Sequence, residues 1–151
     1  MNLRPLKFNW FLLFKLPSAY FSGVRLTHFD SKGATVRVRL NWFTKNPFKS
    51  MFWAIQGMAA ELSTGVIVMD QIRKSGKPFS MLVTQNQATF LKKAKGTIEF
   101  SCDQQDLVAQ SFAKALSTHE GVRFWMNATG KDASGTIVSE FKFEWSIKEK
   151  S

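Results

Sequence analysis

Cysteine and histidine are both rare in this sequence of 151 residues, which contains one cysteine, Cys102, and two histidines, His28 and His119. A single cysteine excludes an internal disulfide and suits a reducing compartment, so we expect a cytoplasmic protein. The two histidines lie far apart and have no partner at a metal-ligand spacing. The sequence therefore predicts no metal site.

Acidic residues are scarce in the first third of the chain. Residues 1–50 contain nine lysines and arginines but only one acid, Asp30, so this third carries +8 of the net charge of +10. A basic segment attracts polyanions such as nucleic acid, anionic lipid or a phosphorylated ligand, or it forms a solvated basic surface. No RNA-binding, helix-turn-helix or zinc-finger motif accompanies it, so we expect no specific nucleic-acid partner.

No apolar run reaches the roughly 20 residues that a membrane span needs. Near the N-terminus, the apolar stretch 10–14 is also too short for a signal peptide and is followed by Lys15 and Pro17. Two interpretations of this segment remain. In the first, which we favour, the segment forms a short helix that packs on the domain and ends at Pro17. In the second, it forms a helix on a membrane surface, since it mixes Trp, Phe, Leu and Lys residues.

The sequence does contain a long apolar helix between two groups of strands. From about Ser50 to Ser75 apolar residues lie on every side of the predicted helix, and Gly76 with Pro78 ends it. A helix that is apolar all round must be covered on all sides. A capping box over 103–106 predicts a second, shorter helix. Alternating patterns predict strands over 23–30, 34–42, 79–90, 96–102, 121–131 and 136–148.

Glu61 is the one carboxylate in the middle of the long helix. Burying an ionised carboxylate without a partner costs several kcal/mol or raises its pKa. Such a residue either pairs across an interface or performs chemistry, and a carboxylate in a dry site is a good general base. Glu61 is therefore the first candidate for a catalytic residue.

Two motifs give this chain a resemblance to a known family. In Asn46–Gly65 an asparagine precedes the helix and an acid lies inside it, and 89–96 reads TFLKKAKG, with Lys93 where the family has proline. The chain resembles the hotdog thioesterase superfamily, in particular its branch of small, uncharacterised bacterial proteins. The resemblance implies one α+β domain over 1–151, in which an antiparallel sheet of about six strands wraps around one long central helix, with an N-terminal helix.

The resemblance also implies an activity and an assembly. Family members mostly hydrolyse acyl-CoA thioesters and need no cofactor, since CoA is part of the substrate. They form homodimers or dimers of dimers whose sheets join edge to edge, with the site between protomers. Carried onto this chain, Glu61 is the base or nucleophile, Asn46 and Gln56 orient the reactants, and the backbone N–H groups of Trp53 and Ala54 hold the oxyanion. An asparagine before a proline is also an ordinary turn residue, which is the other interpretation of Asn46.

Further candidates surround this set. We expect Gly57, Thr64, Gln85 and Asn86 to contact the substrate, with Gln56 and Thr64 near enough to hydrogen-bond Glu61, and Ser50 to cap the helix. Lys92, Lys93 and Lys95 suit the CoA phosphates, or form a solvated strand end.

The sequence departs from the family at the helix start. Phe52-Trp53-Ala54 stands where the family has a histidine-glycine-glycine run. Because the bulky side chains narrow the approach to the carbonyl, the chain has a second interpretation as a non-catalytic protein that binds acyl chains or acyl-CoA.

Overall fold

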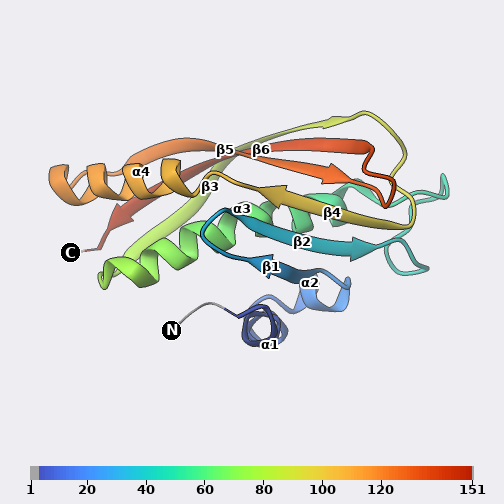
Figure 1. Cartoon of the computed structure of the whole chain (residues 1–151), viewed down its shortest axis with the longest axis horizontal. Coiled ribbons are helices and arrows are strands. Elements are labelled where there is room, and N and C mark those ends of the chain that lie inside the picture. The colour runs from blue at the N-terminus through green and yellow to red at the C-terminus, as the bar shows by residue number, and fades with distance from the viewer. Residues whose placement is uncertain (1–3, 151) are drawn as a thin grey trace.

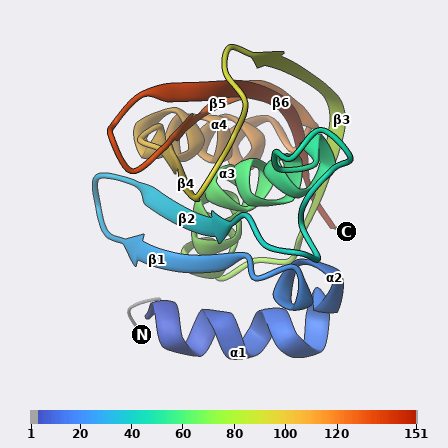
Figure 2. The same ribbon diagram turned by 90° about the vertical axis from the view of Figure 1, so that its right-hand side faces the viewer.

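A six-stranded antiparallel sheet curves around one long helix (Figures 1 and 2). The computed structural model describes residues 4–150. The strand order is β1-β2-β4-β5-β6-β3, so β1 and β3 form the two edges. This arrangement is the hotdog fold that the resemblance implies. The strands are β1 Arg25–Phe29, β2 Ala34–Arg39, β3 Phe79–Phe90, β4 Thr97–Cys102, β5 Val122–Lys131 and β6 Ile137–Glu149; the helices are α1 Pro5–Lys15, α2 Pro17–Phe21, α3 Trp53–Ser75 and α4 Gln105–Thr118.

Helix α3 fills the concave side of the sheet, as the sequence predicts. It ends at Gly76, whose φ of 67° places it in the left-handed region that glycine adopts without strain. It begins three residues later than expected, after Phe52, and no side chain caps it. The prediction of a Ser50 cap is wrong, because the Ser50 hydroxyl bonds to Asn46 in the preceding loop instead.

Strands β2, β4, β5 and β6 show the expected alternation, whereas β3 is exposed at every residue from Gln85 to Phe90. In β2, Val36 and Val38 are buried, while Arg37 and Arg39 are exposed. In β6 the aromatic face is also buried as predicted; it comprises Phe141, Phe143, Trp145 and Ile147. These inward faces and α3 form the core, since burial of apolar surface is the main stabilising term.

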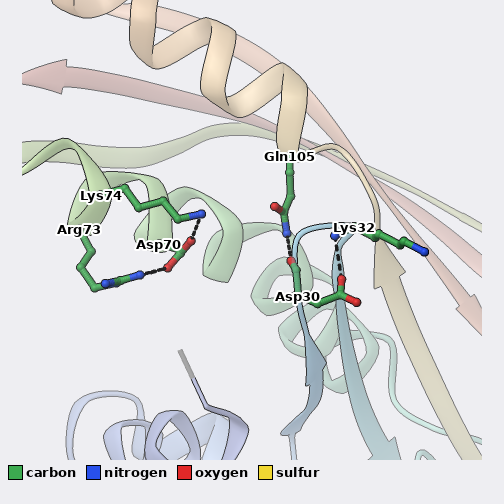
Figure 3. Close-up of polar contacts among 6 residues, drawn as sticks. All are labelled: Asp30, Lys32, Asp70, Arg73, Lys74 and Gln105. Carbon is green, nitrogen blue, oxygen red and sulfur yellow. Dashed lines mark hydrogen bonds and ion pairs between the residues drawn. The ribbon is translucent and has the colours of Figure 1, made fainter. Parts of the chain in front are cut away.

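Helix α4 begins differently from the prediction. Gln104 stands at the N-cap position without a side-chain cap bond, so no capping box forms at 103–106. Its side-chain oxygen instead accepts a bond from the Asn127 N–H at 2.6 Å. The neighbouring Gln105 donates to the Asp30 carbonyl (Figure 3). These amides tie the helix start to β5 and to the β1–β2 turn.

The N-terminal helix packs on the domain as predicted. Phe8 and Leu12 of α1 are buried, and the Asn9 side chain makes two 3.0 Å bonds to the backbone of Leu26. α1 ends before Pro17, which opens the one-turn helix α2. Within residues 4–150 no helix has the length and apolar character needed to cross a membrane.

Candidate functional site

One face of α3 is open, contrary to the prediction that the helix is covered on all sides. Trp53 and Glu61 are exposed, and Gly57 between them is half-buried. These residues lie four residues apart and so form one stripe along the helix. The stripe lies beside β3, which contributes Met81 to the hollow that Glu61 lines. Because β3 forms one edge of the sheet, no further strand of the described chain covers the stripe.

Glu61 lines a hollow of about 320 Å³ between α2, α3, β3 and β6. Its walls are mainly apolar and include Met58, Met69, Met81 and Trp145. These walls partly exclude water from the carboxyl group, and this desolvation raises the pKa of Glu61 above its usual value. Within residues 4–150 no side chain or backbone N–H pairs with its carboxylate. Glu61 therefore has the surroundings of a base rather than of a paired structural acid.

A second hollow, of about 550 Å³, lies at the start of α3. Its lining includes five residues that the sequence analysis predicted for the active site, namely Asn46, Trp53, Gln56, Lys92 and Lys93. In the described part of the chain, the backbone N–H groups of Trp53 and Ala54 have no acceptor. Free donors at a helix N-terminus, together with the helix dipole, favour a negatively charged group.

The Asn46 side chain is occupied by its own loop. Its carbonyl oxygen accepts bonds from the N–H groups of Phe48 and Ser50, at 2.9 and 3.2 Å, and its amide donates to the Ser50 hydroxyl. In this conformation the amide organises the loop before α3, and a substrate would have to compete for it.

Gln56 and Thr64 do not bond to the Glu61 carboxylate, contrary to expectation. Gln56 is buried, donates to the Met51 carbonyl and accepts from the Ser139 hydroxyl at 2.8 Å. Thr64 donates to the backbone carbonyl of Glu61 and accepts from the Trp145 indole at 3.0 Å. Buried polar groups need partners, and strand β6 supplies them to both residues.

The two glycines beside Glu61 give room to aromatic rings. A Cβ on Gly65 would lie 3.3 Å from the Trp145 ring, and one on Gly57 would lie 3.6 Å from the Phe141 ring. The absence of a side chain therefore serves helix–sheet packing at Gly65, whereas a Cβ at Gly57 would make an ordinary van der Waals contact.

The remaining nominated residues are dispersed. Lys92 pairs with the Asp132 carboxylate at 3.1 Å. The hydrogen bond from the Ser134 hydroxyl and then the contact with Lys92 lower the pKa of Asp132 to about 2. Lys93 and Lys95 are exposed, and Lys95 lies outside the hollow. Gln85 and Asn86 are exposed on the edge strand β3 and line neither hollow. Within residues 4–150 no three His, Cys, Asp or Glu side chains gather around a possible metal ion.

The sequence reasoning missed the methionine walls of the Glu61 hollow. Met58, Leu62, Gly65 and Met69 lie three or four residues apart along α3, so they form a stripe next to Glu61. This spacing was available in the sequence. The contribution of Met81 was not, because it depends on where β3 runs.

Asp70, the other acid of α3, has surroundings opposite to those of Glu61. It is 3% exposed, and its two oxygens pair with Arg73 at 2.7 Å and with Lys74 at 2.8 Å (Figure 3). Its charge is fully compensated, so Asp70 has a structural role at the end of the helix.

Comparison with solved structures finds the same fold in proteins of low sequence identity. A Pseudomonas aeruginosa protein of unknown function, called a probable thioesterase, superposes with a TM-score of 0.79 at 18% identity over 97% of both chains. A Chlorobaculum tepidum protein of unknown function has a TM-score of 0.83 at 15% identity over 97% of this chain and 94% of the other.

A Staphylococcus aureus thioesterase enzyme has a TM-score of 0.68 at 11% identity over 87% of this chain and 98% of the other. It was solved with alanine in place of a glutamine, and also with alanine in place of a glutamate fifteen positions further on.

No curated protein matches this chain. The model of one family, described as a domain of unknown function, DUF4442, matches residues 6–147. The chain shares the hotdog fold with these solved structures. Because the family model matches nearly the whole chain, the chain belongs to the DUF4442 family.

Proposed function

We propose that this protein hydrolyses acyl-CoA thioesters with Glu61 as the catalytic carboxylate. The observation that carries the proposal is an unpaired acid of raised pKa in an apolar hollow, on a helix whose first two backbone N–H groups are free. Solved neighbours named as thioesterases support it at the level of the fold.

The arrangement suits hydrolysis in two ways. Glu61 takes a proton from water, whose oxygen attacks the thioester carbonyl, or attacks the carbonyl directly to form an anhydride that water then cleaves. As the C–S bond breaks, the thiolate leaves and receives a proton. The N–H groups of Trp53 and Ala54 stand eight and seven residues before Glu61, about 11 Å along the helix axis. They would therefore hold the negative oxygen of a thioester whose carbonyl carbon is attacked with the help of Glu61 from a second copy of the chain. One such donor contributes roughly 10²–10³ in rate.

The spacing of Asn46 and Glu61 supports their pairing in one site. They lie fifteen positions apart, the separation of the glutamine and glutamate that were each replaced in the S. aureus thioesterase. Asn46 would orient the thioester once substrate displaces its loop contacts.

The lysines at the second hollow would hold the CoA phosphates. Lys93 lines this hollow, and Lys95 lies two residues further along the same loop. Lys92 would contribute less, because Asp132 already neutralises its charge.

A second copy of the chain would complete the site. Both hollows border the free edge of the sheet, since Met81 of β3 lines one and Phe90 of β3 lines the other. A partner joined along β3 would cover the open stripe of α3 and exclude water from Glu61. The expected assembly is therefore a homodimer, or a dimer of dimers.

The helix start favours one alternative. Phe52 and Trp53 pack edge to face and both line the second hollow, where they crowd the path to the free N–H groups. A chain blocked there would bind acyl-CoA without cleaving it.

A thiol-release assay tests the proposal and separates it from this alternative. Acyl-CoAs from short to long chains are given to the wild-type protein and to Glu61→Ala. We expect release with some chain length from the wild type and none from the variant. Absence of release from both, with acyl-CoA still raising the melting temperature, would establish the binding protein and refute the enzyme.

A further inference from the structure

The two N-terminal helices present an apolar face that nothing in the described chain covers. α1 lies along the outside of β1 (Figure 2), and only its inner side is buried there. We define the N-terminal apolar face as the residues that are 40–74% exposed on α1, its C-cap and α2, namely Leu6, Trp10, Phe11, Phe14, Leu16 and Phe21. A surface helix of a globular protein normally turns a polar side to solvent.

The face is continuous along α1. Leu6, Trp10 and Phe14 lie four residues apart, so they form a stripe over more than two turns. The opposite side of the helix is fixed to the domain by Phe8 and by the two Asn9 bonds to Leu26. The stripe is therefore held outwards by the fold, and α1 cannot bury it by rotating.

The charged residues of α1, α2 and the positions that flank these helices are all positive. No acidic residue precedes Asp30, whereas Arg4, Lys7 and Lys15 lie on or next to α1. A second copy that paired through the same face would bring these cations together, and like charges repel. An anionic surface would attract them.

We propose that the N-terminal apolar face docks on membranes that contain anionic lipid. Tryptophan, phenylalanine and leucine insert at the boundary of headgroups and acyl chains, while lysine and arginine contact the headgroups. Docking of this kind is peripheral, and it stands apart from the chemistry of Glu61. It would also bring the Glu61 hollow close to the membrane, because Leu16 belongs both to the face and to the wall of that hollow.

Vesicle flotation of the full chain tests whether the apolar side chains of this face contribute to membrane binding. The probes are phosphatidylcholine vesicles with and without phosphatidylglycerol. We expect binding to the anionic vesicles and a loss of at least about tenfold in Trp10→Ser/Phe14→Ser. The matched control is Trp42→Ser/Phe43→Ser, which removes another exposed tryptophan and phenylalanine, from the loop before α3, and should bind within about twofold of wild type.

A second pair of variants tests the charges. Arg4→Gln/Lys15→Gln should lower binding to anionic vesicles by roughly fivefold for each cation removed. Arg37→Gln/Arg39→Gln, on the exposed side of β2, should have a smaller effect. Wild-type binding should also weaken as salt is raised.

Three results would overturn the proposal. They are no binding to anionic vesicles by the wild type, an equal loss in the Trp42/Phe43 control, and a vesicle-free oligomer that dissociates in Trp10→Ser/Phe14→Ser. The last result would assign the face to a contact between copies. Unchanged melting temperatures would show that each variant is folded.

Discussion

Glu61 and Asp70 lie on one helix, but their carboxylates have opposite surroundings. Asp70 is almost fully buried and pairs with Arg73 and Lys74. Glu61 lines an apolar hollow, without a partner in the described chain. A protein gains no stability from an acid kept in this way, and this difference from Asp70 is the ground for proposing that Glu61 takes part in chemistry.

Replacing Glu61 by glutamine should raise stability at neutral pH. The folded chain binds the Glu61 proton more tightly than the unfolded chain does, because the pKa is raised on folding. The free-energy cost of ionised Glu61 in the folded chain is therefore absent at a pH below the pKa that Glu61 has in the unfolded chain. The cost is complete at a pH above the pKa that Glu61 has in the folded chain. The melting temperature of Glu61→Gln should exceed that of the wild type at neutral pH, and the difference should vanish in acid. An increase that is equal at both pH values would show that ionisation is not its cause.

Replacing Asp70 by asparagine should lower stability. The substitution removes two charge-assisted contacts at a buried position, which costs about 1–3 kcal/mol of unfolding free energy. Urea unfolding of Asp70→Asn and of the wild type measures this loss of unfolding free energy. Glu120→Gln, at an exposed position, is the control and should stay within about 0.5 kcal/mol. Equal stabilities of the two variants would contradict a structural role for Asp70.

At the scale of elements, the start of α3 decides whether the site can hold an oxyanion. Phe52 has φ and ψ of −60° and 135°, a conformation that also suits a residue before proline. Proline is well tolerated at the first helical position, where the N–H has no partner within the helix. The Trp53 N–H can thus be removed without breaking the helix.

This allows a matched test of the Trp53 donor. Trp53→Pro removes both the indole and the N–H, whereas Trp53→Ala removes only the indole. If the N–H stabilises the transition state, Trp53→Pro should be slower in thiol release by roughly 10²–10³ relative to Trp53→Ala. Equal rates in two folded variants would show that this N–H is not a donor in the reaction.

The helices and strands were largely predictable because their signals are local. Alternation gives β3 with the bounds that the sequence predicts, and Gly76 gives the end of α3. The start of α3 was misplaced because Asn46 uses the Ser50 hydroxyl and N–H in its own loop. Cap and loop signals share the same polar residues, so the sequence alone does not separate them.

The candidate site was less predictable than the fold. Its main acid and the free N–H groups follow from α3 alone, so the sequence could nominate them. The partners of Gln56 and Thr64 come from β6, more than eighty residues away in the chain. The open face of α3 follows from β3 lying at the sheet edge. Such non-local pairings leave no mark in a local pattern.

At the scale of the whole molecule, the proposed site needs two copies of the chain. β3 is a long edge strand, exposed from Gln85 to Phe90, and natural proteins rarely leave such an edge unpaired. Sedimentation should give two or four times the mass of one chain, and Leu82→Lys, on this edge, should shift the equilibrium toward the single chain. Turnover per chain should fall with dissociation. A monomer that retains full turnover would contradict a site completed by a partner.

The pH dependence of kcat/KM tests the central claim, that the Glu61 carboxylate is the base or nucleophile, most directly. Because only the ionised form acts and its pKa is raised, kcat/KM for the best acyl-CoA should rise through an apparent pKa above the usual glutamate range. Glu61→Gln, which cannot ionise, should lose at least about a hundredfold in rate together with this pH-dependent rise. Retention of the same rise and rate in Glu61→Gln would show that another group performs the chemistry.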